Sequence, residues 1–265
     1  MRRLVGAVIK ANEIFNFIND KDSIMVGISC GKDSTLLYYA LKLYANQLKL
    51  KRNWDVKVYG IHIKPNFNKD IKYNCYLRWI KQHNLDIKII DSNIAEVLEI
   101  KKDNNRIQCS LCSKMKKAIL IKEAKKLHCN KIAMGHHIDD VIETIFLNMV
   151  NEGRIATFKP NTYLDRSNMY LIRPFILCNE KDIIAVSKKL KVPIIKMMCP
   201  NEKITQRAYF KKFIEKNFYN NKLFVNGYEN FRNMLLNGKN SDLWFYDENT
   251  KNKDLLAIFK KGKAK

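Results

Sequence analysis

The sequence predicts an α/β protein built on a doubly wound, mainly parallel sheet. Through Val150, short apolar or β-branched runs alternate with helical patterns, an order typical of parallel strands joined by crossover helices. The apolar run Ile24–Ile28 passes through a polar turn directly into a helical pattern. Ligands of such sheets bind outside the carboxyl ends of the strands, so we expect a cleft at this edge.

The expected elements follow in a regular order. Leu4–Ile18 begins the chain with apolar residues at helical spacing, and Asp55–Ile63 alternates as a half-buried strand does. The strands are expected over Ile24–Ile28, Asp55–Ile63, Asp86–Ile90 and Lys131–Met134. The helices after the first are expected over Thr35–Leu48, Tyr73–His83, Ser113–Leu127 and Asp139–Val150.

After Val150 the pattern weakens. We predict a loop-rich insert over Asn151–Tyr170, a proline-interrupted strand over Leu171–Phe175 and a helix over Glu180–Leu190. A short extended segment over Val192–Ile195 and two terminal helices over Lys203–Phe218 and Gly227–Leu236 follow. The tail from Lys251 is basic and expected to fray. The predicted division is a nucleotide-binding domain over 1–195 and a helical basic extension over 196–265.

Charge dominates the composition. The 265 residues include 49 Lys and Arg against 26 Asp and Glu, a net charge of +23. A polyanionic partner such as RNA explains this excess, and so does a general Lys and Asn bias, so charge alone does not decide between them. No run approaches the roughly 20 apolar residues of a membrane span. The basic N-terminus has no small-residue cleavage site, so we expect a cytoplasmic protein without membrane contact.

The turn after the first strand has the features of an anion site. Its residues, Ser29, Cys30, Gly31, Lys32, Asp33 and Ser34, stand between a strand and a helix N-terminus. Backbone N–H groups and the helix dipole favour an anion there, and Lys32 adds a positive charge. Asp33 is expected to cap the helix or to hold a metal ion on a phosphate. The spacing is not GxxxxGK[ST], which disfavours an ordinary kinase or GTPase.

Two further groups of residues carry chemistry. Cys109 and Cys112 stand three residues apart and Cys199 follows 87 residues later; a metal site, an iron–sulfur cluster, a redox dithiol and coincidence all stay open for them. The odd number of seven cysteines argues against a disulfide framework. The segment Gly135–Asp140, GHHIDD, follows the fourth strand; it could meet the nucleotide, or its two aspartates could simply cap the next helix.

Taken in order, several of these motifs resemble one family. SCGKDS, CSLCSKMKKAIL, KIAMGHHIDDVIETIFLNM, LIRPF and Cys199 before Gln206-Arg207 are similar to the tRNA 2-thiocytidine synthetases, the TtcA group of the N-type ATP pyrophosphatases. The resemblance runs from the first helix to about Phe245 and is interrupted at Phe67–Tyr76 and Thr157–Met169. It implies the adenine nucleotide α-hydrolase-like (PP-loop) fold.

The resemblance also implies the chemistry. It implies ATP, Mg²⁺ and a [4Fe-4S] cluster as cofactors, the tRNA anticodon loop as substrate, and sulfurtransferase activity that gives 2-thiocytidine. By motif position it implies an ATP loop of Ser29, Gly31, Lys32, Asp33 and Ser34, nucleotide contacts from Gly135, His136 and Asp140, and cluster ligands Cys109, Cys112 and Cys199. Lys32, Asp33 and the three cysteines are the expected catalytic set. A cysteine desulfurase or other sulfide donor and a homodimer are further expectations.

The sequence departs from that family at three places. The family usually has two cysteines near the third ligand, whereas here only Cys199 remains, with Met197 and Met198 before it. Cys30 stands where the loop usually has glycine, and the acidic residue after the second strand is not evident at Ile61-His62-Ile63-Lys64. Alternative hypotheses are an enzyme that thiolates a uridine, an enzyme that joins lysine to a cytidine, a basic zinc- and RNA-binding protein without catalysis, and a desulfurase. Iron with labile sulfide would discount the lysine ligase, and pyrophosphate release would discount the zinc protein.

Overall fold

The computed structural model describes residues 1–68, 70–102, 107–196, 199–201, 205–219, 226–237 and 243–244. Its strands are β1 (Ser23–Ile28), β2 (Lys57–Lys64), β3 (Ile87–Asp91), β4 (Lys131–Ala133), β5 (Asn161–Leu164) and β6 (Met169–Ile172). Its helices are α1 (Arg2–Phe15), α2 (Lys32–Arg52), α3 (Asn74–Gln82), α4 (Ile94–Ile100), α5 (Cys109–Lys126), α6 (Ile138–Glu152), α7 (Glu180–Lys189), α8 (Gln206–Ile214) and α9 (Gly227–Leu236). A 3₁₀ turn (Asp165–Ser167) and a π-helical turn (Glu215–Tyr219) complete the regular structure.

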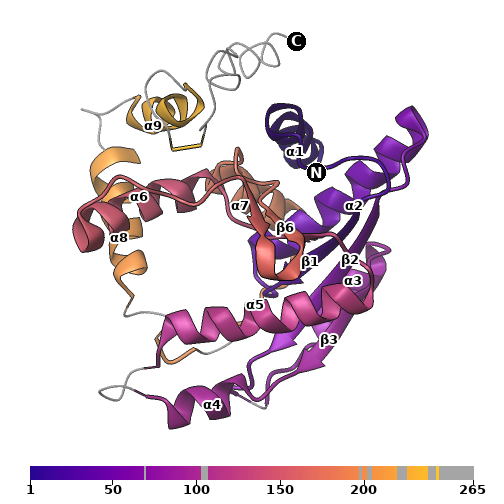
Figure 1. Cartoon of the computed structure of the whole chain (residues 1–265), viewed down its shortest axis with the longest axis horizontal. Coiled ribbons are helices and arrows are strands. Elements are labelled where there is room, and N and C mark those ends of the chain that lie inside the picture. Colours follow the sequence, from indigo (N-terminus) through magenta and orange to yellow (C-terminus); the bar gives the residue numbers. More distant parts are fainter. Residues whose placement is uncertain are drawn as a thin grey trace.

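The strands form one sheet in the order β3-β2-β1-β4-β6-β5. Figure 1 labels β3, β2, β1 and β6 of this sheet. β1 pairs in parallel with β2 on one side and β4 on the other, and β3 and β6 extend the parallel pairing outward. β5 alone among them pairs antiparallel, with β6. The doubly wound, mainly parallel sheet predicted from the sequence is confirmed.

Two apolar layers enclose the sheet. Alternation along β1 sends Ile24, Val26 and Ile28 into one layer and Met25 into the other. The first layer also takes apolar residues from α1, α2, α3, α6 and α7, and the second takes them from α4 and α5. Helices therefore cover both faces, as parallel strands require, and the carboxyl ends of the strands stay available for a site.

The segment after Cys199 packs on the outside of α6. Phe146 of α6 meets an aromatic group from α8, the π-helical turn and α9, with ring centroids 5.7–6.3 Å away; its members are Phe210, Phe213, Phe218 and Phe231. Figure 1 shows α8 and α9 beside α6. The division at residue 195 stays a prediction.

Several element boundaries differ from expectation. α2 begins at Lys32 rather than Thr35, and α5 begins at Cys109, so the CSLC motif lies inside a helix rather than before it. The insert predicted as loop contains the β5–β6 hairpin, and α4 was not foreseen. Val192–Ile195 forms no strand, and the predicted terminal helix from Lys203 starts only at Gln206. The tail from Lys251 lies outside the described residues. Within the described part, no helix has the length and apolar character needed to cross a membrane.

Candidate active site

Hydroxyl groups close the loop after β1. Ser34 Oγ accepts a hydrogen bond from the Ser29 N–H at 2.9 Å and lies 2.9 Å from Ser29 Oγ. Ser29 Oγ accepts a further bond from the Gly31 N–H at 3.3 Å. Gly31 is the N-cap of α2, so the expectation that Asp33 caps this helix is wrong. The loop leads into a helix N-terminus whose first N–H groups have no partner within the helix, which is the geometry of an anion site.

Cys30 adopts a backbone conformation that favours glycine. Its φ is +59° and its side chain is fully buried. The Cys30 carbonyl accepts a hydrogen bond from the Ile195 N–H at 3.1 Å, which helps to fix the turn. Burial raises the pKa of the thiol to about 12, although a contact with Tyr76 opposes the rise. The turn therefore tolerates a Cβ, and Cys30 is a neutral packing residue rather than a nucleophile.

Lys32 is held between two carboxylates. Its Nζ lies 3.0 Å from Asp33 Oδ1 and 2.9 Å from Glu180 Oε1 at the start of α7. The same Glu180 oxygen accepts a hydrogen bond from Lys211 Nζ on α8 at 2.6 Å. Burial alone would raise the pKa of Glu180, but the ammonium groups of Lys211 and Lys32 lower it to about 2. Glu180 is therefore a firmly ionised partner that the sequence analysis missed.

Gly135 lies directly against the loop of residues 29–34, which we call the phosphate loop after its predicted role. A Cβ added to Gly135 would approach Ser34 N to 3.0 Å and the Asp33 carbonyl carbon to 3.2 Å. Gly135 follows β4, whose neighbour in the sheet is β1. Gly135 and Ser34, which are 101 residues apart in the chain, thus meet at the ends of adjacent strands. This is the convergence that parallel pairing predicted.

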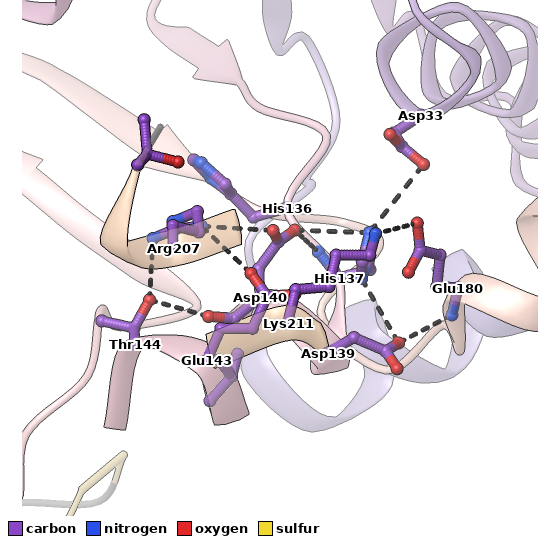
Figure 2. A network of polar contacts seen from close by, with 12 residues as sticks. Asp33, His136, His137, Asp139, Asp140, Glu143, Thr144, Glu180, Arg207 and Lys211 are labelled. Atoms are coloured by element: carbon purple, nitrogen blue, oxygen red, sulfur yellow. Dashed lines mark hydrogen bonds and ion pairs between the residues drawn. The ribbon is translucent and has the colours of Figure 1, made fainter. Parts of the chain in front are cut away.

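His137 lies among three carboxylates (Figure 2). Its ring nitrogens approach Asp139 Oδ2 at 3.4 Å, Asp140 Oδ2 at 3.5 Å and Asp33 Oδ1 at 3.8 Å. Burial alone would lower the pKa of His137, but the aspartates Asp139, Asp140 and Asp33 raise it to about 9. His137 is also the N-cap of α6, and Asp140 accepts a bond from its backbone N–H at 3.0 Å. Asp140 therefore serves helix capping as well as the site.

His136 has a different environment from its neighbour. Its Nδ1 accepts a hydrogen bond from Arg173 Nε at 3.3 Å, and its ring lies against Phe158. Burial is the main reason that the pKa of His136 falls to about 4. The two adjacent histidines therefore face different partners, Arg173 for His136 and aspartates for His137.

Arg207 connects α8 to the acidic face of α6. It donates to Asp140 Oδ1 at 3.2 Å and to Thr144 Oγ1 at 3.0 Å, and Figure 2 shows both contacts. Glu143 lies 3.9 Å from the same guanidinium. Burial, followed by the charge of Asp140, raises the pKa of Glu143 to about 7. The Gln206-Arg207 pair, used above only as a sequence marker, thus brings a cation to the site.

Two of the three predicted thiols lie at the N-terminus of α5. Cys109 and Cys112 lie in its first turn, and Cys109 Sγ accepts a hydrogen bond from Asn201 Nδ2 at 3.4 Å. Burial raises the pKa of Cys112, and the nearby thiols of Cys199 and Cys109 raise it further. Cys199 therefore lies near the other two in space.

These thiols fit a cluster by chemistry, because thiolates are the usual ligands of iron–sulfur clusters. Among the described residues, no three His, Cys, Asp or Glu side chains already converge as a metal site. The other cysteines are dispersed: Cys75 is exposed on α3, and Cys129 and Cys178 are buried separately.

A cavity of about 130 Å³ lies between the loop after β1 and helix α5. Ser29 of the phosphate loop, His62 of β2 and Lys116 of α5 all line it. Lys116 stands one helical turn after Cys112, and its ammonium lowers the pKa of that thiol against the effect of burial. The phosphate loop and the cysteine-bearing helix therefore border one space.

A family model for the PP-loop domain matches residues 5–216. The chain belongs to the PP-loop family. Two similar proteins are the tRNA-cytidine(32) 2-sulfurtransferases of Ralstonia pickettii, 31% identical over 216 residues, and of Actinobacillus pleuropneumoniae serotype 5b, 34% identical over 218 residues. The matches cover 80% and 81% of this chain and 66% and 65% of the relatives. This PP-loop chain thus spans just under two thirds of their length.

A solved structure supports the PP-loop fold. The U34-tRNA thiolase NcsA from Methanococcus maripaludis, determined with its [4Fe-4S] cluster, matches with a TM-score of 0.62 and 18% sequence identity. The match covers 87% of this chain and 78% of that one. At this identity the likeness concerns the fold.

Three residues of the PP-loop site were missed by sequence reasoning. Glu180, Lys211 and Arg207 reach it from α7 and α8, far along the chain. Two of the family motifs pointed to this region: LIRPF precedes α7, and Arg207 belongs to the Gln206-Arg207 pair that follows Cys199. Contacts between residues 148 positions apart, such as Lys32 and Glu180, leave no trace in periodicity.

Proposed function

We propose that this PP-loop protein thiolates tRNA at a cytidine, namely position 32 as in the names of its relatives. ATP first adenylates the C2 oxygen of the base: the oxygen bonds to the α-phosphorus and pyrophosphate leaves. Sulfide then bonds to C2, and AMP departs with the original oxygen. The product is 2-thiocytidine, and the reaction needs no external oxidant or reductant if sulfur enters as sulfide.

The observation that carries the proposal is the shared cavity. Ser29 and Lys116 both line it, and Cys112 lies one helical turn from Lys116. A nucleotide activated at the phosphate loop would therefore lie within reach of sulfur delivered at α5. Proximity of two reactants in one site replaces a bimolecular encounter and lowers the barrier strongly.

The phosphate loop would activate ATP electrostatically. The α2 N-terminus and the Lys32 ammonium would stabilise the charge that develops on the leaving pyrophosphate. Asp33, 32% exposed beside Lys32, would hold Mg²⁺ on the phosphates; the ion would neutralise their charge. Gly135 keeps the space open, because any side chain there would press on the loop backbone.

The thiols of α5 would serve sulfur delivery. Cys109, Cys112 and Cys199 would hold a [4Fe-4S] cluster, which would supply the iron chemistry for sulfur delivery. Lys116 lines the cavity beside them and favours the thiolate form of Cys112. A cysteine desulfurase or another sulfide donor would supply the sulfur, and the homodimer expected from the family stays a prediction.

The decisive experiment joins metal analysis with nucleoside analysis. Protein purified without oxygen should contain iron and labile sulfide, and tRNA from cells that carry it should contain 2-thiocytidine. Cys109→Ala should abolish the 2-thiocytidine. Cys75→Ala, which changes an exposed cysteine on α3, is the matched control and should leave it intact. Equal 2-thiocytidine in cells with Cys109→Ala and with the unaltered chain would overturn the proposal, and 2-thiouridine in its place would reassign the base.

A further inference from the structure

One carboxylate oxygen is shared by two lysines from distant elements. Glu180 Oε1 lies 2.9 Å from Lys32 Nζ of α2 and 2.6 Å from Lys211 Nζ of α8. The Glu180 side chain is 13% exposed and that of Lys32 is 21% exposed, whereas Lys211 is 46% exposed. The pair facing the phosphate loop is thus shielded from water, and Lys211 faces outward.

Glu180 is the fixed member of this group. It is the first residue of α7, and its backbone N–H donates to Asp139 Oδ2 at 2.7 Å. The lysines reach it through long side chains with several rotatable bonds. A change in the site therefore moves the ammonium groups rather than the carboxylate.

We propose that Glu180 competes with the phosphates of ATP for Lys32, and that Lys211 on α8 sets the strength of this competition. The inference rests on the proposed function to the extent that Lys32 binds ATP there. Without nucleotide, Glu180 and Asp33 together hold the Lys32 ammonium in place of a phosphate. When ATP binds, Lys32 turns to the phosphates and Lys211 alone compensates the charge of Glu180.

The arrangement couples the nucleotide to α8. An anion that draws Lys211 away, such as an RNA phosphate, leaves Glu180 with Lys32 as its remaining lysine partner and strengthens that pair. ATP binding then weakens, and by reciprocity bound ATP weakens the hold of that anion on Lys211. Glu180 is thus a positioning residue whose effect on ATP passes through Lys32.

The test uses two substitutions with opposite expected signs. In Glu180→Gln one competitor for Lys32 is lost, so the Kd for ATP with Mg²⁺ should fall roughly twofold to fivefold, as expected for an ion pair worth up to about 1 kcal/mol. In Lys211→Gln the Lys32–Glu180 pair is strengthened, so the Kd should rise by a similar factor. Isothermal titration of the full chain without tRNA measures both. A purely structural role would weaken binding in both variants and lower both melting temperatures.

A double variant and a matched control complete the test. Lys212 carries the same charge at the next, exposed position of α8, so Lys212→Gln in the unaltered chain measures the effect of losing a charge alone. When Glu180→Gln is already present, Lys211→Gln should change the Kd for ATP by no more than that amount, because its effect passes through Glu180. Unchanged ATP affinity in both single variants, or shifts of the same sign, would overturn the inference. Shifts of opposite sign in a protein that makes no 2-thiocytidine would uphold it and reject the proposed function alone.

Discussion

At Cys30 a thiol occupies a backbone conformation that suits glycine. The φ of +59° brings the Cβ of an ordinary residue close to its own backbone, which costs about 1–2 kcal/mol. The buried side chain returns part of this through packing. The phosphate loop of this chain therefore combines local strain with an added contact to the core.

Substitution of Cys30 separates these two effects. Cys30→Gly should change the free energy of unfolding by less than about 1 kcal/mol, since the relief of strain offsets the lost packing. Cys30→Val should destabilise by about 2 kcal/mol or more, because a β-branched residue tolerates this conformation poorly. Urea unfolding measures both. Cys178→Val, at a buried thiol without positive φ, is the control and should cost less than Cys30→Val.

His137 should make stability depend on pH above neutrality. Its pKa is raised from 6.5 to about 9 in the folded protein, so its contribution is complete below pH 6.5 and lost as the pH rises through 9. We expect a loss of about 1–3 kcal/mol between pH 6.5 and 9.5 that is missing in His137→Asn, a variant that can still cap α6. His136, with its pKa lowered from 6.5 to about 4, changes the free energy of unfolding only below pH 6.5. Equal slopes for both proteins in urea unfolding would contradict this assignment.

At this scale the sequence predicted residues at strand ends better than residues on later helices. Asp33, Ser34 and Gly135 meet because adjacent parallel strands end at one edge, a rule that needs only strand assignment. Glu180 and Lys211 were missed because their positions depend on how α7 and α8 pack, which no local pattern specifies.

Among the elements, the approach of β4 to α2 leaves no room for a side chain at Gly135. Gly135→Ala should lower the free energy of unfolding by about 1–3 kcal/mol and weaken ATP binding, since its Cβ would lie 3.0 Å from Ser34 N. Gly6→Ala on α1 is the matched control, because nothing lies within 4 Å of an added Cβ there. It should raise stability by about 0.5–1 kcal/mol. Thermal unfolding of both variants measures the contrast, and a stable Gly135→Ala would refute the steric reason.

Periodicity predicted the long elements and failed at short or irregular ones. The helix over Gly227–Leu236 and the strand from Ile24 agree with α9 and β1 to within a residue. The β5 and β6 strands have only four residues each, too few for alternation to be visible. The start of α5 was placed four residues too late because Cys109 and Cys112 were treated as a loop motif.

For the molecule as a whole, the proposed function assigns nucleotide chemistry and sulfur chemistry to separate parts of the chain. Lys32→Ala should reduce pyrophosphate release at least tenfold, because the loop loses its ammonium, while the visible absorption of the cluster persists. Absorption spectra and pyrophosphate assays on one anaerobic preparation measure both. Loss of both properties together would mean that Lys32 holds the fold rather than the phosphates.

The net charge of +23 should appear in RNA binding. The Kd for tRNA should rise at least tenfold between about 50 and 200 mM salt, because binding releases counterions from the phosphate backbone. Binding of ATP, with fewer charges, should change less. A tRNA affinity that is insensitive to salt would show that the lysine excess reflects composition rather than recognition.

The order of the strands has a consequence for synthesis on the ribosome. β1 leaves the ribosome early, but its neighbour β4 begins at Lys131, more than 100 residues later, and Glu180 and Arg207 emerge later still. A nascent chain that stops before β4 exposes one whole edge of its central strand to the solvent, and chaperones recognise such edges. Truncated chains should therefore be degraded by proteases rather than accumulate with an incomplete nucleotide site.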